Sequence, residues 1–358
     1  MRRDRVTFGI MIGIPLIQLI LFGFAINSDP KHLPTAVVLA DQGAQGRTLL
    51  YGIQNSGYFD LIRLVKTESE GHEVLARGHV QFVINIPENF SRDLLRGDRP
   101  AILVEADATD PAATSNAIGS LRTVLNTALA HDLKGPLGFL AGGGDPIDLR
   151  IHAMYNPEAN TQYNIVPGLM GVVLTMTMVM ITGLAITRER ERGTMENLLS
   201  MPTRPLEVLI GKIVPYVFVG YIQVALILIA SYFLFHVPMV GNLGLLLVVA
   251  LVFIAANLAM GITFSTVAQN QLQAMQMSFF FFLPSLLLSG FMFPFRGMPL
   301  WAQTVGEIFP LTHFLRIVRG ILLKGNGIED VAFQLWQIAL FTAVALTIGV
   351  KRYRQTLD

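Results

Sequence analysis

The sequence predicts an α-helical polytopic membrane protein with six spans and an α/β extracytoplasmic domain inserted between spans one and two. Composition is the first reason: 52% of the 358 residues are hydrophobic and 14% are charged, whereas soluble domains carry about 25% charged residues. Long stretches without charge are the second reason, and a single long polar segment near the N-terminus is the third. An ordinary soluble enzyme and a disordered chain are excluded.

Four stretches lack Asp, Glu, Lys and Arg: residues 6–27, 159–187, 213–295 and 331–350. A membrane-spanning helix needs about 20 apolar residues, so the third stretch holds three spans and the others hold one each. The first apolar run is longer than a signal-peptide core and has no small-residue cleavage site after it, so we expect an uncleaved span. The six expected spans are Val6–Ile26, Ile165–Ile186, Leu209–Phe235, Leu243–Val267, Met275–Phe295 and Val331–Val350.

The basic residues predict the orientation of these spans. With the N-terminus in the cytosol, the cytosolic tails and loops carry 11 basic and 6 acidic residues, while segment 27–163 carries 11 basic and 16 acidic residues. An even number of spans puts the C-terminus on the same side as the N-terminus. We therefore expect both termini in the cytosol and segment 27–163 on the opposite side of the membrane.

Segment 27–163 is long enough for a core of its own. Apolar strands alternate in it with short helices, which predicts a small α/β domain. The expected strands are Ala36–Ala40, Tyr58–Val65, Val80–Ile86 and Ala101–Ala106, and the expected helices are Gly46–Ser56, Glu68–Arg77, Glu88–Arg96 and Pro111–Leu133. Asp110 before Pro111 is typical of an N-cap followed by proline at the first helical position. The stretch Lys134–Asp148 is rich in Gly and Pro and is expected to be a flexible loop.

Motifs for chemistry are missing from the chain. It contains no G-x-x-x-x-G-K-[ST] phosphate loop, no G-x-S-x-G elbow and no H-E-x-x-H pair, so we expect no catalytic residues, no metal site and no bound cofactor. The absence of Cys excludes disulfides and thiolate chemistry, and a net charge of +1 argues against nucleic-acid binding. His72 and His79 are interpreted as surface residues rather than metal ligands.

Apart from edge positions such as Lys212, the polar residues expected inside the spans are neutral, and helix–helix hydrogen bonding is a better interpretation of them than substrate contact. They are Gln18, Thr175, Thr177, Thr182, Gln223, Ser231, Asn257 and Thr263. Ion-coupled transporters usually rely on ionisable groups within the membrane. If this chain moves a substrate, we therefore expect the energy to come from another subunit.

The most informative stretch is Thr187–Pro205. Residues of opposite charge alternate where the chain leaves the membrane, and a short helix is expected to begin near Gly193 or Thr194 and to end before Pro202. Met195, Leu198 and Leu199 share one apolar face of this helix. Spacing leaves two interpretations open: a helix that lies on the membrane surface, or a helix that docks into a partner protein.

The same stretch resembles the permease subunits of type-2 ABC exporters, most closely the multidrug-type subfamily with a large extracytoplasmic domain. The most specific piece is Arg188-Glu189-Arg190-Glu191 followed by Gly193-Thr194-Met195-Glu196 and Leu198-Leu199. Supporting pieces occur in order along nearly the whole chain: Arg3-Asp4, Ser91-Arg92-Asp93-Leu94, Asp107-Ala108-Thr109-Asp110-Pro111, Tyr155-Asn156-Pro157-Glu158, Ile165-Val166-Pro167-Gly168, Gly211-Lys212 and Pro215-Tyr216.

This resemblance implies a separate ATP-binding subunit, which would hold ATP and magnesium, and a second permease subunit in a homodimer or heterodimer. It implies that loop 187–208 is the coupling helix and that segment 296–325 forms short re-entrant helices on the outer side, near Leu300–Ile308 and Leu311–Leu323. The coupling residues implied are Glu189, Glu191, Gly193, Thr194, Met195, Glu196, Leu198 and Leu199. The extracytoplasmic domain would be placed to meet a periplasmic adaptor.

The predicted organisation is therefore a tail and first span (1–26), the extracytoplasmic domain (27–163) and a five-span domain (164–358) in the cytoplasmic (inner) membrane, in contact with lipid. The predicted function is that of a permease subunit of an ATP-driven exporter, without enzymatic activity of its own. Two alternatives remain at this point. One is a membrane-anchored sensor or scaffold whose extracytoplasmic domain binds a ligand or partner; the other, a membrane-embedded enzyme, is disfavoured by the lack of Asp, His and Cys within the spans.

Overall fold

The computed structural model describes residues 31–130, 133, 145–192 and 205–355. The chain divides into a compact unit Asn27–Asn164 and a second unit that contains Ile165–Asp358. The expected first span, Val6–Ile26, lies outside the described residues. Each unit has its own buried apolar core.

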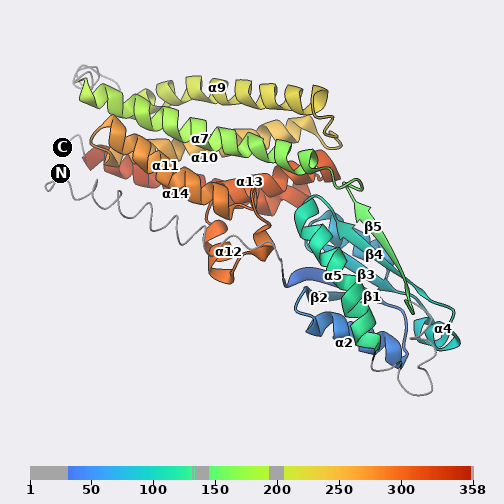
Figure 1. Cartoon of the computed structure of the whole chain (residues 1–358). Helices are drawn as coiled ribbons and strands as arrows, with labels where there is room; N and C mark the ends of the chain where they lie inside the picture. The colour runs from blue at the N-terminus through green and yellow to red at the C-terminus, as the bar shows by residue number, and fades with distance from the viewer. Residues whose placement is uncertain (1–30, 131–132, 134–144, 193–204, 356–358) are drawn as a thin grey trace. The chain divides into compact units, whose positions relative to one another are not determined.

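The first unit is an α/β domain built on a five-stranded sheet with strand order β2-β1-β3-β4-β5 (Figure 1). Strand β4 runs antiparallel to β3, and the other neighbouring pairs are parallel. The strands are β1 (Leu33–Leu39), β2 (Phe59–Val65), β3 (Phe82–Ile86), β4 (Ala101–Asp107) and β5 (Asp148–Met154). The helices are α2 (Ala44–Asn55), α3 (Glu68–Ala76), α4 (Phe90–Arg96) and α5 (Pro111–Leu129).

Helices cover the two faces of this sheet unequally. Leu49 of α2 and Leu121 of α5 belong to the larger core, together with Phe59 and Phe82, whose rings meet edge to face with centroids 5.4 Å apart. On the other face α3 contributes Leu75 to a smaller core against β1 and β3. Because both faces are covered there, β1 and β3 are buried along almost their whole length. The predicted alternation of apolar strands with short helices is confirmed.

Polar side chains fix two helix starts in this unit. The Asp110 carboxylate accepts a hydrogen bond from the Ala113 N–H at 3.4 Å with Pro111 at the first helical position, as predicted. Ser91, in the first turn of α4, donates its hydroxyl to the Asp41 carboxylate at 2.6 Å and its N–H to the other oxygen at 3.2 Å. The Ser91–Asp41 pair ties the end of β1 to the start of α4, a contact that the sequence does not predict.

Strand β5 was not expected from the sequence. The Gly- and Pro-rich stretch Lys134–Asp148 leads into it, and its seven residues include exposed positions on both sides, since β5 is an edge strand. Pairing with β4 from Ala101 opposite Asp148 to Asp107 opposite Met154 supplies its backbone hydrogen bonds.

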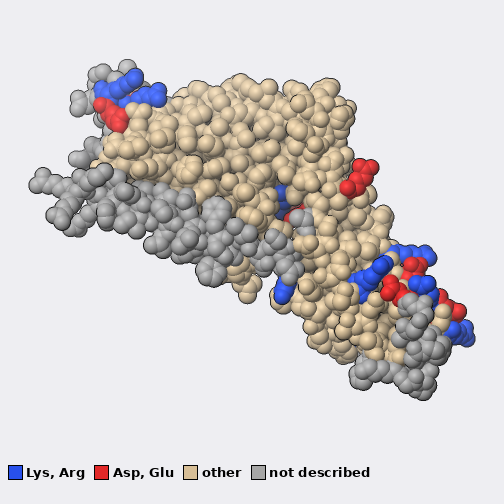
Figure 2. Space-filling model, in the orientation of Figure 1, with Lys and Arg blue, Asp and Glu red and all other residues tan. Residues whose placement is uncertain are grey.

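The second unit contains long apolar helices that run side by side (Figure 1). They are α7 (Thr161–Glu191), α9 (Pro205–Phe233), α10 (Leu243–Val267), α11 (Gln271–Leu288) and α14 (Ile328–Gln355). Within the described residues, all five are long and apolar enough to cross a membrane. Figure 2 shows a broad surface along this unit without charged side chains, which suits contact with lipid.

Helices α7, α10 and α14 match the expected spans or extend them, α9 begins four residues earlier and ends two residues earlier than expected, and α11 differs more. It begins four residues before the expected Met275 because the Asn270 side chain accepts the Gln273 N–H at 2.8 Å as an N-cap. It ends at Leu288 rather than Phe295, close to Gly290, whose φ of +82° is readily adopted only by glycine.

Short helices follow α11: the 3₁₀ turn η2 (Phe295–Gly297), α12 (Leu300–Gly306), α13 (Pro310–Arg319) and the π-helical turn η3 (Gly320–Lys324). We call residues Phe295–Lys324 the α12–α13 hairpin. Its apolar side enters the core of the unit, where Phe314 of α13 stacks on Phe253 of α10 with ring centroids 4.0 Å apart. The two predicted amphipathic pieces of this segment are therefore helical.

Small and neutral polar residues join the long helices. A Cβ on Gly261 of α10 would lie 2.7 Å from the Thr182 Cβ of α7, so the two helices are in close contact there. Thr177 of α7 donates to Gln223 of α9 at 2.9 Å, and Thr263 of α10 donates to the Ala345 carbonyl of α14 at 3.0 Å. These contacts confirm the predicted helix–helix role for Thr177, Gln223 and Thr263.

Candidate functional site

The predicted coupling residues fall into two groups. Glu189 and Glu191 lie in the last turn of α7 and are described. The remaining six lie outside the described residues: Gly193, Thr194, Met195, Glu196, Leu198 and Leu199. Their predicted positions on one short helix stay a prediction.

Glu191 contacts the start of α11, although the two residues are 80 positions apart. One oxygen of its carboxylate accepts the backbone N–H of Gln271 at 2.7 Å, and the other accepts the side-chain amide of Gln271. Gln271 is the first residue of α11, and the first N–H groups of a helix have no partner within the helix. Glu191 therefore acts as an additional cap for α11, with its negative charge at the positive end of the helix dipole.

Arg188 completes this contact. It precedes Glu191 by three residues, so the two side chains leave the same face of α7. The Arg188 Nε donates to the Gln271 Oε1 at 3.4 Å. The Gln271 amide thus presents its oxygen to a cation and its nitrogen to an anion, and this arrangement fixes its orientation. We call Arg188, Glu191 and Gln271 the α7–α11 clamp.

The clamp lowers the pKa of the Glu191 carboxyl below its ordinary value of 4.5. The main cause is the hydrogen bond from the Gln271 side chain, and the second is the hydrogen bond from its backbone N–H. Both hydrogen bonds favour the ionised form. Glu191 is therefore a carboxylate at neutral pH, as the clamp requires.

The other end of α11 is attached to the α12–α13 hairpin. Arg319 of α13 donates from both terminal guanidinium nitrogens to the Gly290 carbonyl, at 3.3 and 3.4 Å. Leu288 packs in an apolar cluster with Ala302 of α12. A Cβ on Gly306 would lie 2.6 Å from the Leu288 carbonyl oxygen, so α12 and the end of α11 are closely packed.

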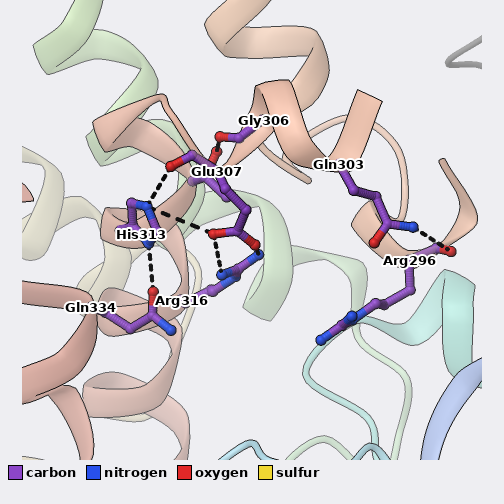
Figure 3. A network of polar contacts seen from close by, with 8 residues as sticks. Arg296, Gln303, Gly306, Glu307, His313, Arg316 and Gln334 are labelled. Atoms are coloured by element: carbon purple, nitrogen blue, oxygen red, sulfur yellow. Dashed lines mark hydrogen bonds and ion pairs between the residues drawn. The ribbon is translucent and has the colours of Figure 1, made fainter. Parts of the chain in front are cut away.

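A polar network holds the corner between α12 and α13 (Figure 3). Glu307 pairs with both terminal nitrogens of Arg316, at 2.6 and 3.1 Å. The buried ring of His313 contacts the Glu307 carbonyl with Nε2 at 2.8 Å and Gln334 of α14 with Nδ1 at 2.6 Å. The network therefore joins α12, α13 and α14. The sequence analysis did not identify Gln271, His313 or Gln334 as functional residues. Each is a polar residue beside an apolar run, and that pattern alone does not indicate a contact between helices.

Nothing in the described part of the chain forms a group of three His, Asp or Glu side chains that could hold a metal ion. We call the second unit the membrane unit. Two charged or polar clusters are its candidate functional features. One is the α7–α11 clamp beside the predicted coupling segment, and the other is the network of the α12–α13 hairpin.

These features define a multi-pass membrane protein. Its buried apolar cores hold each unit together, and its charged groups connect helices. The model of the ABC-2 family transporter proteins matches residues 5–351, and the chain belongs to this family. It is therefore a permease-type chain, and the family supports a role in transport.

Three curated relatives from Escherichia coli strain K12 match almost end to end. "Probable multidrug ABC transporter permease YbhS" is 30% identical over 90% of this chain and 85% of its own length. "Probable multidrug ABC transporter permease YbhR" is 26% identical over 99% of this chain and 95% of its own length. "Inner membrane transport permease YhhJ" is 30% identical over 96% of this chain and 93% of its own length. The resemblance drawn from the residues is confirmed at the level of the family.

Proposed function

We propose that this chain is the membrane-spanning subunit of an ATP-driven exporter and that a separate ATP-binding subunit drives it through segment 187–208. The observation that carries the proposal is a family match from residue 5 to residue 351 in a chain without a phosphate-binding loop. A transport permease of this family needs a source of energy. The chain has no phosphate-binding loop, and its predicted spans carry no Asp, Glu, Lys or Arg apart from Lys212 at the edge of one span.

We place the protein in the inner membrane. In the proposed topology both termini lie in the cytosol, and the α/β unit lies on the opposite side of the membrane. The charge distribution of the tails and loops supports this orientation. Under it, the α7–α11 clamp lies at the cytosolic side and the α12–α13 hairpin lies at the outer side. Two relatives are named as probable multidrug permeases, which supports drugs as a working substrate class.

A second permease subunit belongs to the proposal. Helices α9 and α14 leave large apolar side chains exposed, among them Phe218, Phe233 and Phe333. Lipid and a second permease are the two surroundings that suit such surfaces. A periplasmic adaptor that meets the α/β unit is proposed on the resemblance alone.

Co-purification of an ATP-binding subunit tests this function. The wild-type chain, expressed with the ATPase subunit and solubilised in mild detergent, should retain that subunit through two chromatographic steps. Leu198→Asp places a charge on the predicted apolar docking face and should release the subunit while the permease still inserts into the membrane. A matched charge in the loop between α9 and α10, Met239→Asp, should have no effect. If the chain purifies alone under all conditions, the sensor or scaffold interpretation gains support.

A further inference from the structure

The α7–α11 clamp joins two helices at the point where the proposed driving subunit acts. Segment 193–204 begins two residues after Glu191, which is the last residue of α7. Glu191 binds both the first N–H and the side-chain amide of α11. A displacement of the end of α7 therefore acts on the start of α11 through two hydrogen bonds to a charged group, which are stronger than neutral ones.

Helix α11 then reaches the α12–α13 hairpin. Its 18 residues span about 27 Å at about 1.5 Å per residue. At its far end three contacts attach it to the hairpin: the Arg319 bonds to Gly290, the packing of Leu288 on Ala302, and the close approach of Gly306 to the Leu288 carbonyl. Pro284 lies only four residues before the end of the helix, so most of α11 keeps an unbroken ladder of backbone hydrogen bonds.

We propose that Glu191 and Gln271 are positioning residues that make the end of α7 and helix α11 move together, so that α11 carries the movement from the cytosolic side to the α12–α13 hairpin. The inference rests on the proposed function in one respect, namely that an ATPase subunit acts at the segment after Glu191. It assigns to Glu191 a task within its own chain, in place of a contact with the ATPase subunit.

The clamp allows a reciprocal exchange that tests this role. Gln271→Glu alone sets two carboxylates against each other and removes the amide donor. Glu191→Gln combined with Gln271→Glu returns one amide and one carboxylate to the pair, and the amide oxygen at position 191 can still accept the backbone N–H of residue 271. The carboxylate then at position 271 also faces Arg188, which now contacts Gln271 at 3.4 Å. The double variant should restore what the single variant loses.

The chain contains no Cys, so one introduced cysteine can be labelled specifically, and the spectrum of that label reports on its position. Leu300 of α12 is 80% exposed and suits a spin label introduced through Leu300→Cys. The labelled chain is assembled in nanodiscs with the ATPase subunit, whose own thiols are blocked beforehand. The spectrum of the label is recorded without nucleotide and after trapping with ATP and vanadate.

We expect a nucleotide-induced change in the wild-type background. Glu191→Ala and Gln271→Glu should each reduce that change at least fivefold while the ATPase subunit still co-purifies, and the reciprocal double variant should restore it to within twofold. Gln269→Ala, which changes an exposed neighbour of Gln271, should leave it unchanged.

Three results would overturn the inference in an intact complex: a full response in Glu191→Ala and Gln271→Glu, no rescue by the double variant, or no nucleotide response in the wild type. If the wild-type chain retains no ATPase subunit, the proposed function fails first, and the inference falls with it. Co-purification therefore separates the two failures.

Discussion

Phe253 of α10 and Phe314 of α13 stack with their ring planes inclined by only 10° and their centroids 4.0 Å apart. Both rings are fully buried. The pair anchors the α12–α13 hairpin in the core of the membrane unit, so the hairpin is a packed part of the fold. Its position relative to the long helices depends on this contact and on the polar network around His313.

Phe314→Ala removes one ring of the stack and leaves a cavity. Truncation of a buried Phe costs about 3–5 kcal/mol in protein cores, and we expect a lower thermal unfolding midpoint in detergent, by about 5 °C or more. Phe333→Ala is the matched control, because Phe333 of α14 is 67% exposed. Equal midpoints for the two variants would show that the stack does not anchor the hairpin.

His313→Phe should loosen the corner between α12 and α13. The substitution leaves the Glu307 carbonyl and the Gln334 side chain without the partner that they have now. Both contacts are partly buried, so the cost is smaller than the roughly 1–3 kcal/mol of a fully buried unpaired group. Trypsin should then cleave faster after Arg296 or Arg316. His236→Phe changes an exposed histidine and serves as the control; unchanged cleavage in His313→Phe would contradict the role of the network.

Gly261→Ala should push α7 and α10 apart. The added Cβ would lie 2.7 Å from the Thr182 Cβ and 2.8 Å from the Val179 carbonyl oxygen. We expect a lower yield of folded protein and a lower unfolding midpoint. Gly211→Ala makes the same change on α9, where a Cβ meets nothing within 4 Å, and should be neutral or stabilising because Ala favours helix more than Gly. The prediction fails if both substitutions behave alike.

The α7–α11 clamp should weaken in acid. The pKa of Glu191 is lowered from 4.5 by its hydrogen bonds with Gln271. A lowered carboxyl pKa means that the contact is fully formed above the ordinary pKa and is lost as the pH falls through the lowered value. The protection factor of the Gln271 backbone amide against hydrogen exchange should therefore decrease as the pH is lowered from 4.5. Glu191→Gln should abolish this dependence, whereas Glu158→Gln should preserve it.

Periodicity and charge predicted the larger features of this fold. The stretch Leu243–Val267 is a helix with the expected bounds because apolar residues fill it and Asn242 caps it. The α/β unit was expected from apolar strands between short helices, and Asp110 was expected as a cap because the residues that form it are neighbours in sequence. These signals are local, so a single sequence contains them.

Contacts between distant positions could not be predicted in the same way. Strand β5 has exposed residues along its length and needs β4 to form. Gln271 looked like part of a polar loop, and its role depends on Glu191, 80 residues earlier. His313 meets Gln334 only after α13 packs on α14. Such pairs depend on tertiary structure, and no spacing rule identifies them.

The central claim is that an ATPase subunit drives this permease through the segment after α7. Its most direct test is the rate of ATP hydrolysis when purified ATPase subunit is titrated against the permease in nanodiscs. The account predicts that the wild-type permease stimulates hydrolysis at least several-fold in a saturable manner, and that Leu198→Asp abolishes the stimulation while Met239→Asp retains it. Hydrolysis that is indifferent to the wild-type permease, or equal stimulation by wild type and Leu198→Asp, would contradict the claim.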